Sequence, residues 1–331
     1  SGTSNVATGE QGIRDAHAMC RATASTLGIK PAEVLVASTG VIGHLLPMDK
    51  ILPGIDELAP KLGRGKFADS AAADAILTTD LVRKTAVRKA TLGGKPVAFG
   101  GICKGSGMIA PNMATMLAFI TTDAKITPGM LKTALQYAVG TTFNRISVDS
   151  DKSTSDSVMV LANGQAGHQP IDKPGKRFNT FIETLTELCR DLCYQLLQDG
   201  EGVTRLMRVR ILNAASEKDA DRVGRSIVDS PLVKTALHGA DPNWGRIAMA
   251  AGKSDANLNH NTLSIRIGGM NIYERGQPTE VGLKPPTKLQ KAMGKKEVMI
   301  EVDLGAGRHE AEWLGCDLSR QYVAINADYT T

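Results

Sequence analysis

The chain has 331 residues, of which 42% are hydrophobic and 22% charged, a composition typical of a globular protein with one large domain or two ordinary ones. Its net charge of +5 is small for this length, and the spread of its basic residues together with an aromatic content of 4% argues against a nucleic-acid partner. No apolar stretch approaches about 20 residues and no secretory pattern is present, so we expect no membrane partner.

Five cysteines are scattered along the chain without a CxxC motif, and the six histidines form no HxH or HExxH pattern. Cys189 and Cys193 lie four residues apart on a predicted helix, where small core residues are expected. We therefore expect no metal site and a reducing location, the cytoplasm.

The first third of the chain is predicted to be mostly helical. Helices are expected over residues 13–27, 47–62 with a break at Pro53-Gly54, and 67–77. A buried strand is expected over 33–37, and a hairpin joins strands 88–92 and 96–99 through Gly93-Gly94.

Two polar turns follow these elements. Ser38-Thr39-Gly40 ends the predicted strand 33–37, and it is either an ordinary turn or a set of N–H and hydroxyl donors facing a ligand. Thr78-Thr79-Asp80 follows the third helix and, from its residues alone, is a polar helix end.

The stretch 104–122 begins with a lysine in a glycine-rich loop, has Ala114-Thr115 at its centre, and continues into an apolar run that predicts a buried strand. Its glycines fit G-x-G-x-x-A, but Pro111 follows at once without helical periodicity, so we reject a dinucleotide site. Thr115 is either a β-branched strand residue or a nucleophile that a cut after Ala114 exposes, with its own α-amine as the base.

The second half alternates helices and strands. Thr127-Pro128 opens a helix, and further elements are predicted at 146–148 (strand), 178–197 (helix), 206–212 (strand), from Ser216 (helix), and at 263–267, 271–273 and 298–304 (strands). The helix 178–197 carries an apolar stripe with the 3.6-residue period, and the strand 206–212 alternates, with Met207 and Val209 inward and Arg208 outward. Asp149-Ser150-Asp151 is expected to be a turn, Asp241–Arg246 a turn with a tryptophan anchor, and 278–296 a surface excursion. Glu201 lies between two glycines and is predicted in a loop, exposed if it has no function.

Residues 104–119 resemble the self-cleavage segment of the ornithine acetyltransferases, also called glutamate N-acetyltransferases. Further motifs follow in the family's order: Ser38–Gly43, Thr78–Asp80, Val148-Asp149 with Ser153-Thr154, Asp199–Gly202, Asp241–Arg246 and Ile325–Tyr329. Several long motifs in one order make this match specific. The family usually has glycine where Ser150 stands, so we expect local backbone strain there.

The resemblance implies an α/β (α+β) fold, a layered αββα sandwich of the N-terminal-nucleophile class. It implies self-cleavage between Ala114 and Thr115 into an α chain, 1–114, and a β chain, 115–331, which pack as one unit and assemble as two copies of each. It also implies that a few tens of residues precede this chain in family members.

The resemblance further implies transfer of an acetyl group from N-acetylornithine to glutamate through an acetyl-Thr115 intermediate, without a cofactor. Thr39 and Gly40 would form the oxyanion hole. Substrate contacts would come from the residues that match the family's pattern: Thr78, Lys104, Thr115, Glu201, Asn326 and Thr331.

Whether acetyl-CoA is also accepted as an acetyl donor stays open on the sequence. Two other functions also stay open: an aminopeptidase or amidase of the same fold with water as acceptor, and an uncleaved metabolite-binding protein.

Overall fold

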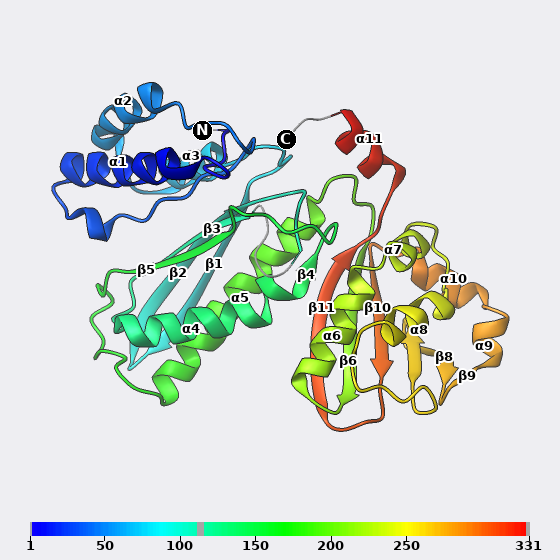
Figure 1. Ribbon diagram of the computed structural model, residues 1–331. Helices are drawn as coiled ribbons and strands as arrows, with labels where there is room; N and C mark the ends of the chain where they lie inside the picture. The colour runs from blue at the N-terminus through cyan, green and yellow to red at the C-terminus, as the bar shows by residue number, and fades with distance from the viewer. Residues whose placement is uncertain (1, 111–115, 329–331) are drawn as a thin grey trace.

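The computed structural model describes residues 2–110 and 116–328, and Figure 1 shows their arrangement. The strands form two sheets, one of four strands in the order β1-β2-β3-β5 and one of seven in the order β4-β11-β6-β10-β7-β8-β9. Helices pack against both sheets, so the predicted layered α/β class is confirmed.

The N-terminal part is a small helical layer. It consists of α1 (Gly9–Leu27), η1 (Pro31–Glu33), α2 (Met48–Leu58), η2 (Ala59–Lys61) and α3 (Lys66–Ala75). The helix α1 packs on α2 and ends, as predicted, at Gly28, whose φ of 68° closes the last turn. Figure 1 shows this layer, in blue, at one end of the four-stranded sheet.

Two predictions for this layer are wrong. Residues 33–37 form no strand: Glu33 belongs to η1, Leu35 is exposed, and no strand pairs with them in the described part of the chain. The helix α2 runs through Pro53 without a break. Proline removes the hydrogen bond to the carbonyl of Asp49, but Asp49 is exposed, so water can replace that donor.

The four-stranded sheet contains β1 (Lys84–Leu92), β2 (Lys95–Lys104), β3 (Leu117–Thr122) and β5 (Ser157–Ala162). The predicted hairpin is confirmed, because β1 pairs antiparallel with β2 through Gly93 and Gly94, and both have the positive φ that a two-residue turn requires. The strand β3 pairs antiparallel with β2 and parallel with β5.

The helices α4 (Pro128–Thr141) and α5 (Lys176–Gln198) pack together, and α5 lies on β1 and β2. The predicted apolar stripe of α5 is confirmed as its buried face, Cys189 and Cys193 included. A Cβ at Gly101 of β2 would lie 3.0 Å from Leu188 and Leu192, so this glycine lets the helix approach the sheet closely.

The seven-stranded sheet combines short and long strands. They are β4 (Ile146–Ser147), β6 (Leu206–Ala214), β7 (Ser264–Ile267), β8 (Met270–Glu274), β9 (Gln277–Pro278), β10 (Glu297–Asp303) and β11 (His309–Cys316). The predicted alternation in β6 is confirmed, with Met207 and Val209 buried and Arg208 paired to Glu297 and Glu312 on the other face.

The helices of this half are α6 (Glu217–Val228), α7 (Pro231–His238), α8 (Trp244–Gly252), α9 (Glu280–Leu283), α10 (Thr287–Met293) and α11 (Arg320–Asp328), and η3 (Phe143–Arg145) precedes β4. As predicted, Ser216 caps α6, its Oγ accepting from the N–H of Asp219. The prediction of a surface excursion over 278–296 is wrong in part, because α10 buries Leu289 and Met293 in the hydrophobic core that the seven-stranded sheet forms with its helices.

Candidate functional site

One cavity brings together segments that are far apart in the sequence. It has a volume of about 290 Å³ and is lined by Gly2, Thr39, Gly40, Ile42, Leu77, Thr78, Thr79, Lys104, Gly107, Met108, Ser153, Ser155, Glu201 and Asn326. All the predicted site residues that the structure describes are among them: Thr39, Gly40, Thr78, Lys104, Glu201 and Asn326. The other three, Ala114, Thr115 and Thr331, lie outside the described residues.

The Thr39-Gly40 turn offers hydrogen-bond donors to this cavity. Thr39 is 7% exposed, and its Oγ1 has no hydrogen-bond partner among residues 2–110 and 116–328. Gly40 has a φ of 131° and passes so close to the N-terminal segment that a Cβ would lie 2.2 Å from the carbonyl of Gly2. A buried hydroxyl without a partner, beside a glycine in a conformation that other residues rarely adopt, is suited to hold an oxygen that becomes negative.

Lys104 places a buried ammonium at the cavity. It lies at the end of β2, is 1% exposed, and its Nζ donates to Thr78 Oγ1 at 2.7 Å. Burial lowers the pKa of Lys104, and the negative charge of Asp80, whose Oδ2 lies 3.8 Å from Nζ, opposes that shift. The predicted contact of this lysine with a substrate carboxylate is therefore compatible with its surroundings.

Glu201 and Asn326 form another part of the cavity lining. Asn326 of α11 donates from Nδ2 to Glu201 Oε2 at 3.0 Å, and the backbone of Glu201 is fixed by its N–H bond to the carbonyl of Ser106 at 2.9 Å. Glu201 is half-buried rather than exposed. Gly107 has no side chain for a steric reason, since a Cβ there would lie 2.4 Å from Glu201 Oε2.

Two aspartates that the sequence analysis did not assign to the site hold both flanks of residues 111–115. Asp149 accepts the N–H groups of Met108 at 2.6 Å and Ile109 at 2.8 Å. Asp156 Oδ1 accepts the N–H of Met116 at 2.8 Å. The parallel register of β3 and β5 sets the second contact, because Leu117 lies opposite Ser157.

The turn between these aspartates has the strain predicted for it. Ser150 has a φ of 70°, a conformation in which glycine is the usual residue. Its Oγ donates to the carbonyl of Asp229 at 3.0 Å, a contact that glycine could not make.

The burial of Asp156 predicts how the stability of the protein depends on pH. Its Oδ2 is buried without a hydrogen-bond partner in the described ranges, and burial raises its pKa from the ordinary 3.8 to about 7. The folded protein therefore retains a proton that the unfolded chain releases, so stability from this group is full below pH 3.8 and is lost as the pH rises to about 7.

The isosteric variant Asp156→Asn keeps the acceptor for Met116 but cannot ionise. We expect its melting temperature, relative to that of the unaltered protein, to rise between pH 4 and pH 8 in thermal unfolding followed by circular dichroism. A difference between the two proteins that is constant over this range contradicts the raised pKa.

In the described part of the chain, no group of three histidine, cysteine, aspartate or glutamate side chains is placed to hold a metal ion. None of the described helices combines the length and the apolar content needed to cross a membrane.

Comparisons with known proteins agree with the motif order. The model of the ArgJ family matches residues 1–331. The "Arginine biosynthesis bifunctional protein ArgJ" of Bacillus cereus is 43% identical over 331 residues, covering 100% of this chain and 80% of the relative. The proteins of that name from Geobacillus kaustophilus and Deinococcus radiodurans are each 45% identical, with 80% and 81% of their lengths covered.

A solved structure is also similar. The crystal structure of the arginine biosynthesis bifunctional protein ArgJ from Bacillus halodurans superposes with a TM-score of 0.60 at 39% identity. The match covers 63% of this chain and 97% of the solved one.

Proposed function

The chain belongs to the ArgJ family, and on this premise we propose that it is an acetyltransferase of arginine biosynthesis that moves the acetyl group of N2-acetyl-L-ornithine to L-glutamate. One observation carries the assignment to this site: six predicted residues from distant segments line a single cavity. The cavity holds one ammonium, one carboxylate and several hydroxyls, which suits an amino acid with its own carboxylate and ammonium.

The proposed reaction has two acyl-transfer steps. The Thr115 hydroxyl attacks the acetyl carbonyl of N-acetylornithine while the α-amine of Thr115 takes its proton. The tetrahedral intermediate collapses as that proton passes to the departing nitrogen, which leaves ornithine and an acetyl ester on Thr115. The amine of glutamate then attacks the ester, giving N-acetylglutamate and restoring the hydroxyl.

The lining residues have complementary roles in this proposal. The hydroxyl of Thr39 and the backbone N–H of Gly40 donate to the oxygen that becomes negative in each tetrahedral intermediate. Lys104 and Thr78 bind the substrate carboxylate, and Glu201 with Asn326 binds the substrate amino group. Thr331 completes the substrate contacts.

We also propose that the chain cuts itself between Ala114 and Thr115 into an α chain, 1–114, and a β chain, 115–331. The match to a shorter solved chain supports this, because residues 115–331 make up about two-thirds of the sequence, close to the 63% matched. The resemblance to the family supports an assembly of two α and two β chains in the cytoplasm.

The names of the relatives bear on whether the protein uses a second acetyl donor. Relatives are named bifunctional, which supports acetyl-CoA as a second donor to glutamate on the same Thr115. No other cofactor enters the proposed chemistry.

Mass spectrometry and an acetyl-transfer assay test the proposal together. Denatured protein is expected to give two masses, those of residues 1–114 and 115–331. Without acetyl-CoA, the purified protein is expected to form N-acetylglutamate only when both N-acetylornithine and glutamate are present, with ping-pong kinetics.

The other outcomes are distinct. If N-acetylornithine is consumed equally fast without glutamate, the protein is a hydrolase. If one mass is found and acetylornithine is bound without turnover, it is an uncleaved binding protein. Formation of N-acetylglutamate from acetyl-CoA in place of N-acetylornithine supports the second donor.

A further inference from the structure

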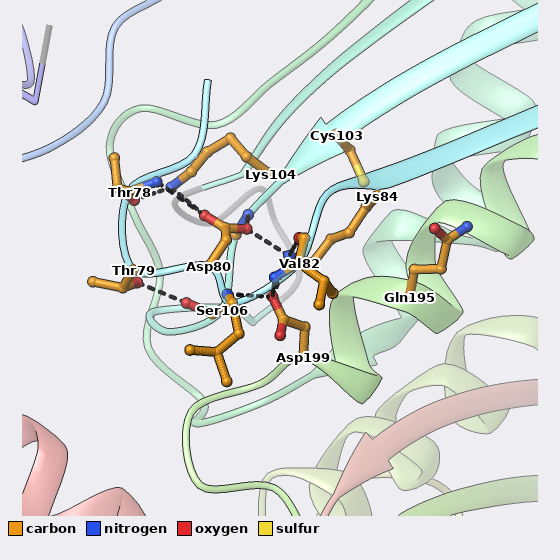
Figure 2. A network of polar contacts seen from close by, with 12 residues as sticks. Thr78, Thr79, Asp80, Val82, Lys84, Cys103, Lys104, Ser106, Gln195 and Asp199 are labelled. Carbon is orange, nitrogen blue, oxygen red and sulfur yellow. Dashed lines mark hydrogen bonds and ion pairs between the residues drawn. The ribbon is translucent and has the colours of Figure 1, made fainter. Parts of the chain in front are cut away.

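Four charged side chains lie together, one of them, Lys104, in the lining of the cavity, and Figure 2 shows them. Lys84 begins β1 and Lys104 ends β2, and the antiparallel register places Lys84 opposite Cys103, the residue before Lys104. Asp80 comes from the turn before β1, and Asp199 follows the end of α5. The side chains of all four are 5% exposed or less.

Lys84 is held between both carboxylates. Its Nζ lies 2.6 Å from Asp80 Oδ1 and 2.6 Å from Asp199 Oδ2, and it also donates to the carbonyl of Val82 at 3.2 Å. A buried ion is stable only when opposite charge and hydrogen bonds replace the water it has lost. With two partners of opposite charge, Lys84 meets that condition without reaching the cavity, whose lining it does not join.

Backbone groups fix the two carboxylates as well. Asp80 Oδ1 accepts the N–H of Gly105 at 2.6 Å, and Asp199 Oδ2 accepts the N–H of Leu81 at 3.0 Å. The position of Asp80 is therefore set from two sides, by Lys84 and by the loop that follows Lys104.

Lys104 is bound differently. Its short contact, 2.7 Å, is to the neutral hydroxyl of Thr78, whereas Asp80 Oδ2 stands 3.8 Å away. The charge of Asp80 thus acts on Lys104 from a distance, and the ammonium faces a cavity rather than a closed ion pair. The two cations and two anions balance each other, so the group adds no net charge to the interior.

We infer that Asp80, held in place by Lys84 and Asp199, is a positioning residue that keeps the Lys104 ammonium charged and directed at the cavity. Lys84 also has a positioning role, because by occupying Asp80 Oδ1 it prevents Asp80 from closing onto Lys104 and competing with a substrate carboxylate. This inference rests on the proposed role of Lys104 as the carboxylate contact.

Asp80 and Lys84 act on Lys104 with opposite signs, since the charge of Asp80 raises its pKa and that of Lys84 lowers it, while the charges of Glu201 and Asp156 also raise it and are unchanged in variants of Asp80 and Lys84. Asp80→Asn is therefore expected to lower the pH at which Lys104 loses its proton, and Lys84→Met to raise it. An effect of about one pH unit in each direction is expected from charges this close.

Two measurements on the processed enzyme report the pH at which Lys104 loses its proton. The first is the alkaline limb of kcat/KM for N-acetylornithine, in which the substrate's own titration is the same for every variant. The second needs no catalysis: the pH dependence of Lys104 labelling by a small amine-reactive reagent, read by peptide mass spectrometry. Lys84→Met is also expected to raise KM about tenfold, with kcat nearly unchanged, because Asp80 then competes for Lys104.

Lys234→Met is the matched control. Lys234 is also a buried lysine, 2% exposed, but it donates to the carbonyl of Cys316 and lies outside the cavity lining. Lys234→Met is expected to change neither the alkaline limb of kcat/KM nor the pH dependence of Lys104 labelling. If Lys84→Met does not fold, Lys84→Met combined with Asp199→Asn removes the charge together with its partner and must show the same upward shift.

Shifts in the same direction, or none, in Asp80→Asn and the Lys84 variant overturn the inference, even when acetyl transfer persists. Loss of the proposed function is a separate result: the unaltered protein then transfers no acetyl group, while labelling still reports on Lys104. Opposite shifts in labelling support the inference in either case.

Discussion

Replacing Thr115 with alanine is expected to abolish both processing and acetyl transfer. The proposed reaction uses the hydroxyl of this residue twice, once to cut the chain before it and once to carry the acetyl group. Loss of a covalent nucleophile typically lowers kcat by about 10⁶-fold. Thr115→Ser, which keeps a hydroxyl and an α-amine, is the matched control and is expected to be cut and to retain measurable activity.

The measurement is the intact mass of each variant together with N-acetylglutamate formation. Thr115→Ala is expected to give one mass, that of the full chain, and no product above the uncatalysed background. An alanine variant that is cut and active would show that another group is the nucleophile.

Replacing Gly40 with alanine is expected to lower kcat by about 100-fold or more, the usual consequence of losing an oxyanion donor. Gly40 has a φ of 131°, and a Cβ on it would lie 2.2 Å from the carbonyl carbon of Gly2 and 2.6 Å from the nitrogen of Thr3. Neither backbone can yield easily, because Val41 is hydrogen-bonded to Gly2 and to Ser4. The turn must move, and the donors of Thr39 and Gly40 move with it.

Gly43→Ala is the matched control for this change. Gly43 lies in the same loop and also has a positive φ, 85°, but a Cβ there would meet no atom within 4 Å. It is expected to reduce stability slightly and to leave kcat within a few-fold of the unaltered value. Equal kcat values for the Gly40 and Gly43 variants would mean that this turn does not serve the reaction.

Elements with strong local patterns were predictable from the sequence. The stripe of α5, the alternation of β6 and the Gly93-Gly94 turn all carry their information within one or two dozen residues, and the structure has each of them. The prediction of a strand at 33–37 was wrong, because a short apolar run carries no information about whether another strand is available to pair with it. Helix α2 passes through Pro53 because solvent reaches the freed carbonyl.

The residues that line the cavity were predictable from the sequence, but the charged residues that hold them in place were not. Thr39, Lys104 and Glu201 were found through family motifs, and they do line one cavity. Asp80, Lys84 and Asp156 were not assigned a role, because the contacts of Lys84 with Asp199, of Asp80 with Lys104 and of Asp156 with Met116 join residues far apart in the sequence. The Lys84–Asp199 contact, for example, joins positions 115 residues apart.

The place of β3 in its sheet has a consequence for a protein cut between Ala114 and Thr115. One product would end shortly after β2 and the other would begin just before β3, yet these strands are hydrogen-bonded neighbours from Phe99 to Lys104. The two polypeptides would remain joined by the backbone of the sheet itself, and only its unfolding would release them. The nick would create a new terminus without creating a new, separable subunit.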